Sequence, residues 1–179
     1  MQKRYFLSAL TLGLLASYAG TAVAQDKFKI GLILPMTGPF ASTGKQIEAA
    51  ARLYIAQNGD TVGGKKVELI VKDDTSAPDV TKRIAQELVV NEKVNVLAGF
   101  GLTPLAMATA PLATQSKTPM VVMAAATSSI TQASPYVVRT SFTLPQASVA
   151  MADWAPNNGI KKVVTDRKST RLNSSHTVV

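Results

Sequence analysis

The chain has 179 residues, a formal net charge of +8, no cysteine and a single histidine. Without cysteine it can form no disulfide and offers no thiolate nucleophile or thiolate metal ligand. Half of the net charge lies in the first 24 and the last 14 residues, and the other basic residues are scattered among acidic ones. This distribution argues against a nucleic-acid partner. Because 46% of the residues are hydrophobic, a packed core is expected to supply the stability.

Residues 1–24 have the three-part layout of a secretory signal peptide. Lys3 and Arg4 precede an apolar run at 6–19, and an Ala-Val-Ala triplet ending at Ala24 supplies the small residues that signal peptidase accepts. The apolar run is short for a membrane span, so we expect cleavage after Ala24 and a periplasmic location. A retained membrane anchor is the alternative, whereas a lipid anchor is excluded because no cysteine follows the apolar run.

The first predicted elements show the alternation of parallel βαβ units, with short β-branched runs between segments of helical period. A strand at 27–35 leads through a Gly- and Pro-rich loop into a helix at 45–58, whose apolar residues share one face: Ile47, Ala50, Ala51, Tyr54 and Ile55. Three glycines then turn the chain into a strand at 65–73. The helix that follows, at 79–92, has an apolar face formed by Val80, Ile84, Leu88 and Val89.

The second half of the body continues this alternation. A strand at 94–99, an Ala-rich helix at 103–115 and a strand at 119–124 are followed by a polar loop at 127–134. An extended piece at 136–141, a helix at 145–155 and a strand beginning at Lys161 complete the pattern. The continuous apolar strands indicate a sheet covered by helices on both faces. We therefore predict an α/β fold with a doubly wound parallel sheet, forming one lobe over residues 25–145.

The last residues, 166–179, have no apolar periodicity and follow abruptly on a strand-like segment. The run from Asp166 to His176 resembles a translated sequencing adapter. We therefore expect residues 166–179 to be a non-native tail, and the fold prediction excludes them. A natural disordered basic tail is the alternative.

Ligands of open parallel sheets bind beyond the carboxyl ends of the strands, where helix N-termini present free N–H groups. The loops at those ends are 36–44, 73–78, 100–104 and 124–129. Thr103 followed by Pro104 predicts a hydroxyl N-cap and a helix start that accepts a carboxylate, and an ordinary cap without ligand is the alternative. The small residues and three hydroxyls at 124–129 suit an ammonium or a carboxylate, unless the hydroxyls satisfy their own backbone.

Signatures of nucleotide sites are present only in incomplete form. Five residues separate Gly38 from Gly44 where a P-loop has four, and Gln46 replaces the hydroxyl that holds magnesium. Gly99 and Gly101 are two of the three glycines of a dinucleotide fingerprint. A nucleotide or dinucleotide cofactor is therefore not expected.

Catalytic constellations are also scarce. The one histidine, His176, lies in the expected tail, so His-based triads and His/Cys metal sites are not available to the body. Asp73, Asp74 and Asp79 together suggest a cation site, but a solvated turn with Asp79 as a helix cap is the preferred interpretation. These observations predict a binding protein with no cofactor and no metal, and not an enzyme.

Five motifs follow one another through the body: IGLILPMTGPFASTG at 30–44, Asp-Asp at 73–74, Ala-Gly at 98–99, Ala-Ala-Thr at 125–127 and Val-Arg-Thr at 138–140. Over residues 27–165 their order and spacing resemble the leucine/isoleucine/valine-binding protein family, the periplasmic binding components of ABC importers. The resemblance implies two α/β lobes that close on a ligand. Residues 25–145 would form the first lobe, and residues 146–165 would begin a second, truncated one.

The resemblance also implies the site residues. Thr103 falls where the family places a carboxylate-binding hydroxyl, and Ala125 and Thr127 fall where a backbone group and a hydroxyl meet the ligand head. Ser42 and Thr43 lie in the loop that lines the cleft. The implied function is a periplasmic receptor that delivers a branched-chain amino acid, or a related small carboxylate or amide, to the permease of an ABC importer. A periplasmic sensor lobe of the same fold and a nucleotide-dependent enzyme are the alternatives.

Overall fold

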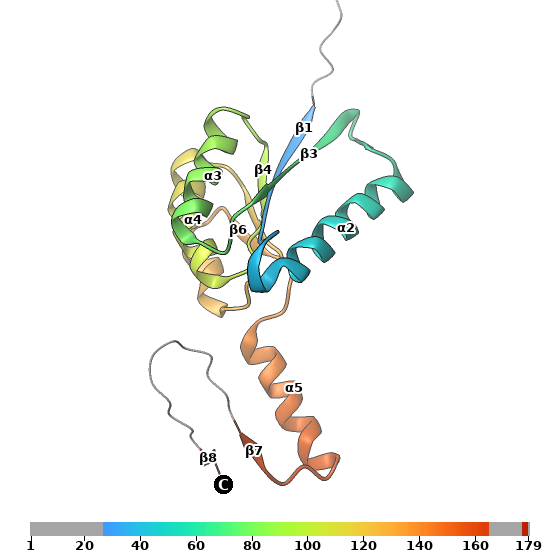
Figure 1. Cartoon of the computed structure of the whole chain (residues 1–179), viewed down its shortest axis with the longest axis vertical. Coiled ribbons are helices and arrows are strands. Elements are labelled where there is room, and N and C mark those ends of the chain that lie inside the picture. Colours follow the sequence, from blue (N-terminus) through green and yellow to red (C-terminus); the bar gives the residue numbers. More distant parts are fainter. Residues whose placement is uncertain (1–26, 165–176, 179) are drawn as a thin grey trace, which may run out of the picture.

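The computed structural model describes residues 27–164 and 177–178, with a six-stranded sheet in the middle of the main body (Figure 1). The short strand β2 (Thr61–Val62) pairs antiparallel with the first strand of a parallel set ordered β3-β1-β4-β5-β6. Those five strands are β3 (Lys65–Asp73), β1 (Phe28–Leu34), β4 (Val96–Gly99), β5 (Met120–Val122) and β6 (Val137–Arg139). The predicted parallel sheet is confirmed, whereas the predicted signal peptide lies outside the described residues.

Helices lie on both faces of the sheet, as predicted for a doubly wound fold. Helix α2 (Ala41–Asn58) is on one face, and α3 (Pro78–Val90) and α4 (Thr103–Ser116) pack side by side on the other (Figure 1). Two 3-10 turns, η1 (Gly38–Phe40) and η2 (Ser128–Gln132), follow β1 and β5. The fold class is therefore confirmed.

The main core lies between the sheet and helices α3 and α4. Ile84 and Leu88, predicted for the inner face of α3, are 8% and 0% exposed and pack with apolar residues of β1, β4, β5 and α4. Complete burial of a side chain of this size contributes about 1.5–3 kcal/mol. On the other face a smaller cluster of Leu32, Leu34 and Ala98 packs against residues that include Ile47 of α2.

Helix α2 differs from its prediction at its start and on its inner face. It begins at Ala41 rather than at residue 45, because η1 leads directly into it, and Ser42 and Thr43 are therefore helical. Its later turns slant away from the sheet (Figure 1), and Tyr54 is 66% exposed. Ala50 is exposed as well, so the predicted apolar face is wrong for these two residues.

The elements beyond β6 extend away from the sheet (Figure 1). Helix α5 (Leu144–Asn157) begins with a capping box, in which Thr143 Oγ1 accepts from the Gln146 N–H and Gln146 Oε1 accepts from the Thr143 N–H. Strand β7 (Val163–Val164) pairs antiparallel with β8 (Thr177–Val178), which falls within the segment predicted as a tail. The rest of that segment lies outside the described residues.

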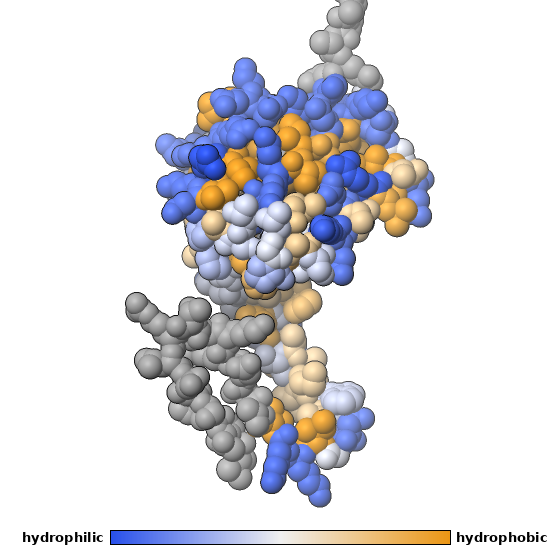
Figure 2. Space-filling view, viewed as in Figure 1, coloured by the Kyte–Doolittle hydropathy of each residue, from blue (hydrophilic) through white to orange (hydrophobic). Residues whose placement is uncertain are grey.

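Helix α5 exposes much of its apolar surface. Its side chains that are more than half exposed include Leu144, Val149, Met151 and Trp154. Hydrophobic residues are visible on this segment below the main body in Figure 2. No helix within residues 27–164 is long and apolar enough to span a bilayer.

Candidate ligand-binding site

The strand order reverses at β1, since the chain passes to β3 on one side and to β4, β5 and β6 on the other. Doubly wound sheets bind ligands beyond the carboxyl ends of the strands at such a reversal. Backbone hydrogen bonds join the loops at this edge: Phe100 N–H donates to Ile33 O (3.0 Å), Met123 N–H to Gly99 O (2.8 Å) and Ala125 N–H to Phe100 O (3.0 Å). The loops after β1, β4 and β5, which the sequence singled out, therefore lie together.

Thr103 and Thr127, both predicted as site residues, meet at this edge, where their hydroxyl oxygens are 2.8 Å apart. Either hydroxyl can donate to the other, so the pair keeps one O–H group for a ligand. The predicted cap is wrong, because Leu102 holds the N-cap position of α4 and the Thr103 hydroxyl is turned to Thr127. The first turn of α4, whose N–H groups have no intrahelical partner, begins beside this hydroxyl pair.

Arg139, the last residue of β6, contacts the loop that carries Thr127. Its guanidinium donates from Nη1 to the carbonyls of Thr127 (2.7 Å) and Ala125 (3.4 Å), and from Nη2 to the carbonyl of Ser128 (3.2 Å). Ala125 is 2% exposed, and its N–H group already donates to Phe100 O. Its carbonyl accepts from Arg139, so both backbone polar groups of Ala125 have a partner within the protein. The Val-Arg-Thr motif at 138–140 contains Arg139 but does not indicate this role, because no local pattern shows which carbonyls the side chain reaches.

Asp73 holds the loop after β1. One carboxylate oxygen accepts from the backbone N–H groups of Met36 and Thr75, both at 2.9 Å, and the other accepts from Thr37 Oγ1 at 2.6 Å. Partial burial alone would raise the pKa of Asp73, but these hydrogen bonds stabilise the carboxylate and hold the pKa below its ordinary value. The charge of Asp73 is thus used within the protein.

The neighbouring Asp74 is 0% exposed, and its pKa is raised by burial, against the hydrogen bond from the Ser76 N–H and with a smaller contribution from the charge of Asp73. Asp79 is in the first turn of α3, where Ala77 holds the N-cap position, so the predicted cap role of Asp79 is wrong. A carboxylate in the first turn is still favoured by the helix dipole. Among the described residues, no group of three or more His, Cys, Asp or Glu is arranged to hold a metal ion.

Ser42 and Thr43 lie in the first turn of α2 and not in a loop, with Ser42 exposed and Thr43 half-buried. This turn sits against the end of β1, because a Cβ atom on Gly44 would lie only 2.2 Å from the carbonyl oxygen of Pro35. The structure therefore places Ser42 and Thr43 at the carboxyl edge of the sheet. It does not join them to the Thr103–Thr127 pair through any hydrogen bond seen in the described part of the chain.

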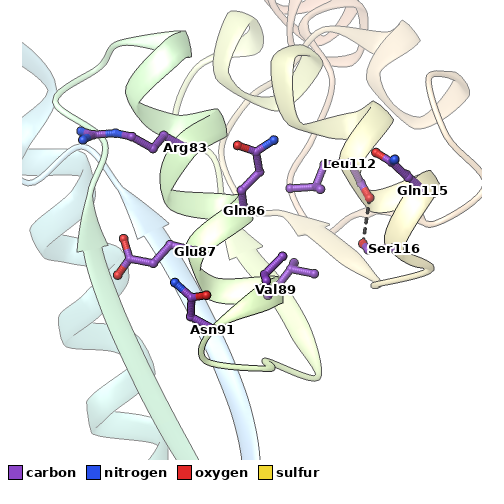
Figure 3. Close-up of a pocket in the computed structure, with 9 residues that line it drawn as sticks. Arg83, Gln86, Glu87, Val89, Asn91, Leu112, Gln115 and Ser116 are labelled. Carbon is purple, nitrogen blue, oxygen red and sulfur yellow. Dashed lines mark hydrogen bonds between the residues drawn. The ribbon is translucent and has the colours of Figure 1, made fainter.

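A separate groove of about 740 Å³ lies between α3 and α4 (Figure 3). Its lining comes from the middle and C-terminal turns of α3 and from the C-terminal turns of α4, and it includes Arg83, Gln86, Glu87, Val89, Leu112 and Gln115. The C-terminal ends of these helices lie at the amino edge of the sheet, opposite the loops described above. The groove is therefore distinct from the candidate site.

The reversal of strand order, with the hydroxyl pair at the carboxyl edge, is the arrangement at which doubly wound α/β folds of the ligand-binding class bind their ligands. The model of the periplasmic binding protein family matches residues 27–167, and the chain belongs to this family. A Leu/Ile/Val-binding protein homolog 6 from Brucella abortus (strain 2308) is 49% identical over 158 residues, which are 88% of this chain and 40% of that protein. The resemblance inferred from the motifs is confirmed.

Two solved structures of ABC-transporter solute-binding proteins are also similar to the chain. One, from Rhodopseudomonas palustris BisB5 in complex with 3,4-dihydroxybenzoic acid, is 67% identical with a TM-score of 0.73, over 76% of this chain and 38% of that one. The other, from Rhodopseudomonas palustris HaA2 in complex with p-hydroxybenzoic acid, is 49% identical with a TM-score of 0.72, over 75% and 37%. The chain thus spans about 40% of the length of these relatives.

Proposed function

We propose that this chain provides the first ligand-binding lobe of a periplasmic receptor that delivers a small carboxylate to the permease of an ABC importer. The observation that carries the proposal is the Thr103–Thr127 hydroxyl pair, 2.8 Å apart at the point where the strand order reverses. The similarity to solute-binding proteins of ABC transporters supports it. In this proposal residues 25–145 form the first lobe, and residues 146–165 begin a second lobe that continues beyond this chain.

The ligand we propose is a hydroxylated benzoate, because the charges at the site suit an anion. The loops after β1, β4 and β5 contain no acidic residue. The carboxylates nearest along the edge, Asp73 and Asp74, are held by hydrogen bonds or fully buried, while the guanidinium of Arg139 lies beside Thr127. A carboxylate fits this arrangement better than the ammonium of an amino acid. The two benzoate-bound relatives support this choice, whereas the Brucella relative favours a branched-chain amino acid as second candidate.

Titration calorimetry on the complete two-lobe protein tests this proposal, with 3,4-dihydroxybenzoate, 4-hydroxybenzoate and leucine as ligands. A hydroxybenzoate should bind most tightly. Replacing either hydroxyl, in Thr103→Val or Thr127→Val, should weaken binding about 5- to 150-fold, because a lost hydrogen bond to a buried charged group costs about 1–3 kcal/mol. Thr61→Val is the matched control, because Thr61 is exposed and lies in β2, which pairs with the amino end of β3, away from the carboxyl edge that carries the site.

Unchanged affinity in both site variants would show that the ligand binds elsewhere. Tight binding of leucine with no response to either benzoate would overturn the choice of ligand and keep the site. A receptor for import, unlike a sensor lobe, is required for uptake, so a deletion strain should lose uptake of the labelled benzoate. Uptake that persists in the deletion strain would favour the sensor.

A further inference from the structure

Arg139 lies at the carboxyl end of β6, beside the loop that follows β5. In the β5–β6 register it lies opposite Val122, the last residue of β5, so its side chain is next to the loop that leaves that strand. Three of the next carbonyls along that loop, those of Ala125, Thr127 and Ser128, accept hydrogen bonds from its guanidinium. One side chain therefore ties down a stretch of four residues that contains Thr127.

The geometry of these contacts suits arginine. The guanidinium is a rigid planar fork with five donors on three nitrogens, whereas a lysine ammonium has three donors on one rotatable nitrogen and cannot reproduce the spread of the fork. No ion pair of Arg139 with a carboxylate is found among residues 27–164. The groups that the guanidinium contacts are therefore the carbonyl dipoles of the loop. Hydrogen bonds from a charged donor to neutral carbonyls are shorter and stronger than neutral ones.

Apart from Arg139, single backbone hydrogen bonds hold the loop around Thr127: the Leu144 N–H donates to Ala126 O (2.9 Å), and the Ile130 N–H donates to Thr127 O (3.3 Å). Ala125 is anchored through its N–H bond to Phe100, and Ile130 of η2 is fully buried, but Thr127 itself has extended backbone between these two anchors (φ −69°, ψ 127°). Thr103, by contrast, is held by helix α4. The 2.8 Å contact between the two hydroxyls therefore depends on the backbone of 125–128. Binding sites tolerate displacements of only about 0.5 Å in such contacts.

We propose that Arg139 is a positioning residue of the ligand site, which holds loop 125–128 so that the Thr127 hydroxyl meets Thr103, and that it acts on affinity through Thr127 without touching the ligand. The effect on affinity rests on the proposed function. The effect on the loop does not, because the hydrogen bonds to its carbonyls are made within the protein.

Hydrogen exchange followed by mass spectrometry tests the loop in the ligand-free complete protein. In Arg139→Lys and Arg139→Gln, peptides covering 123–130 should exchange at least tenfold faster, while peptides of β1 and α3 stay unchanged. Arg83→Lys and Arg83→Gln are matched controls, since Arg83 is an exposed residue of α3 that lines the separate groove between α3 and α4 (Figure 3). Unchanged exchange at 123–130 in both Arg139 variants would overturn the proposal.

A double-mutant cycle with calorimetry tests the effect on affinity. Arg139→Lys should weaken binding of the hydroxybenzoate about tenfold in the native background and less than twofold in a Thr127→Val background. An equal loss in both backgrounds would mean that Arg139 acts directly on the ligand. Full affinity in Arg139→Lys with a loss in Arg139→Gln would mean that only its charge matters, and either result overturns the proposal. If no benzoate binds, the exchange experiment still decides the role of Arg139.

The unmodified protein offers a test that does not depend on the folding of a variant. In a sample labelled with ¹⁵N, the Nη hydrogens of Arg139 should exchange slowly with solvent and give resolved resonances, because three carbonyls hold them. The exposed Arg83 is the internal reference. Exchange at Arg139 as fast as at Arg83 would show that the guanidinium is not held by the loop.

Discussion

Gly99→Ala should be among the most damaging single-methyl changes in the lobe. Gly99 ends β4 directly before the loop at the candidate site, with φ +112°, and an added Cβ would lie 2.1 Å from the carbonyl oxygen of Ile33 in β1. The left-handed backbone costs a side chain about 1–2 kcal/mol. The contact costs about 1–3 kcal/mol more, because the obstacle is backbone of a central strand and cannot rotate away. The expected loss is therefore about 2–5 kcal/mol.

Two other glycines separate these two contributions. At Gly64 φ is +77° and nothing lies within 4 Å of the added Cβ, so Gly64→Ala should cost only the conformational part, about 1–2 kcal/mol. Gly31 has no positive φ, and its added Cβ would meet the flexible end of Leu88 at 2.9 Å, so Gly31→Ala measures overpacking alone.

Urea unfolding of the complete protein, followed by circular dichroism, gives the three losses in unfolding free energy. Gly99→Ala should also weaken ligand binding, because the carbonyl of Gly99 accepts from the Met123 N–H and so helps to join the loops of the site. If Gly99→Ala costs no more than Gly64→Ala, the close approach of β4 to β1 does not restrict this position, and the reasoning from backbone contact is refuted.

Three further predictions concern pH, solubility and export. Because hydrogen bonds lower the pKa of Asp73 in the folded state, its contribution is present above its unfolded pKa of about 4 and is lost as pH falls through the lower folded value. Asp73→Ala should therefore be less stable than the native protein at pH 7, with a difference in urea midpoint that shrinks below pH 4, and a constant difference would contradict this. Residues 25–179 alone should be poorly soluble and show no ligand-dependent rise in melting temperature, since Val149, Met151 and Trp154 are exposed; saturable stabilisation by an amino acid, amide or aromatic acid in a thermal-shift screen would refute it. Expression in a Gram-negative host should yield a periplasmic protein that begins at Gln25, and N-terminal sequencing that finds Met1 would exclude cleavage.

The alternation of strands and helices could be predicted because it depends on patterns within each segment. Residues 65–73 form β3 as predicted. A short run with β-branched and apolar residues, bounded by glycines on one side and a turn on the other, is too short for a helix and is typical of a strand. The start of α2 was misplaced because Ser42, Thr43 and Gly44 are residues typical of turns. The structure instead uses Gly44 for a close approach to Pro35, a contact nine residues apart in the chain that no local pattern shows.

Within the candidate site, the sequence by itself determined which loops lie at the carboxyl edge and which of them carry hydroxyls. Only the tertiary structure decided that Thr103 bonds to Thr127 and not to its own helix, and that Arg139 contacts the loop that carries Thr127. The physical reason is distance along the chain. A cap or a strand is decided by neighbouring residues, whereas these contacts join residues 24 and 12 positions apart, and strand pairing alone brings them within reach.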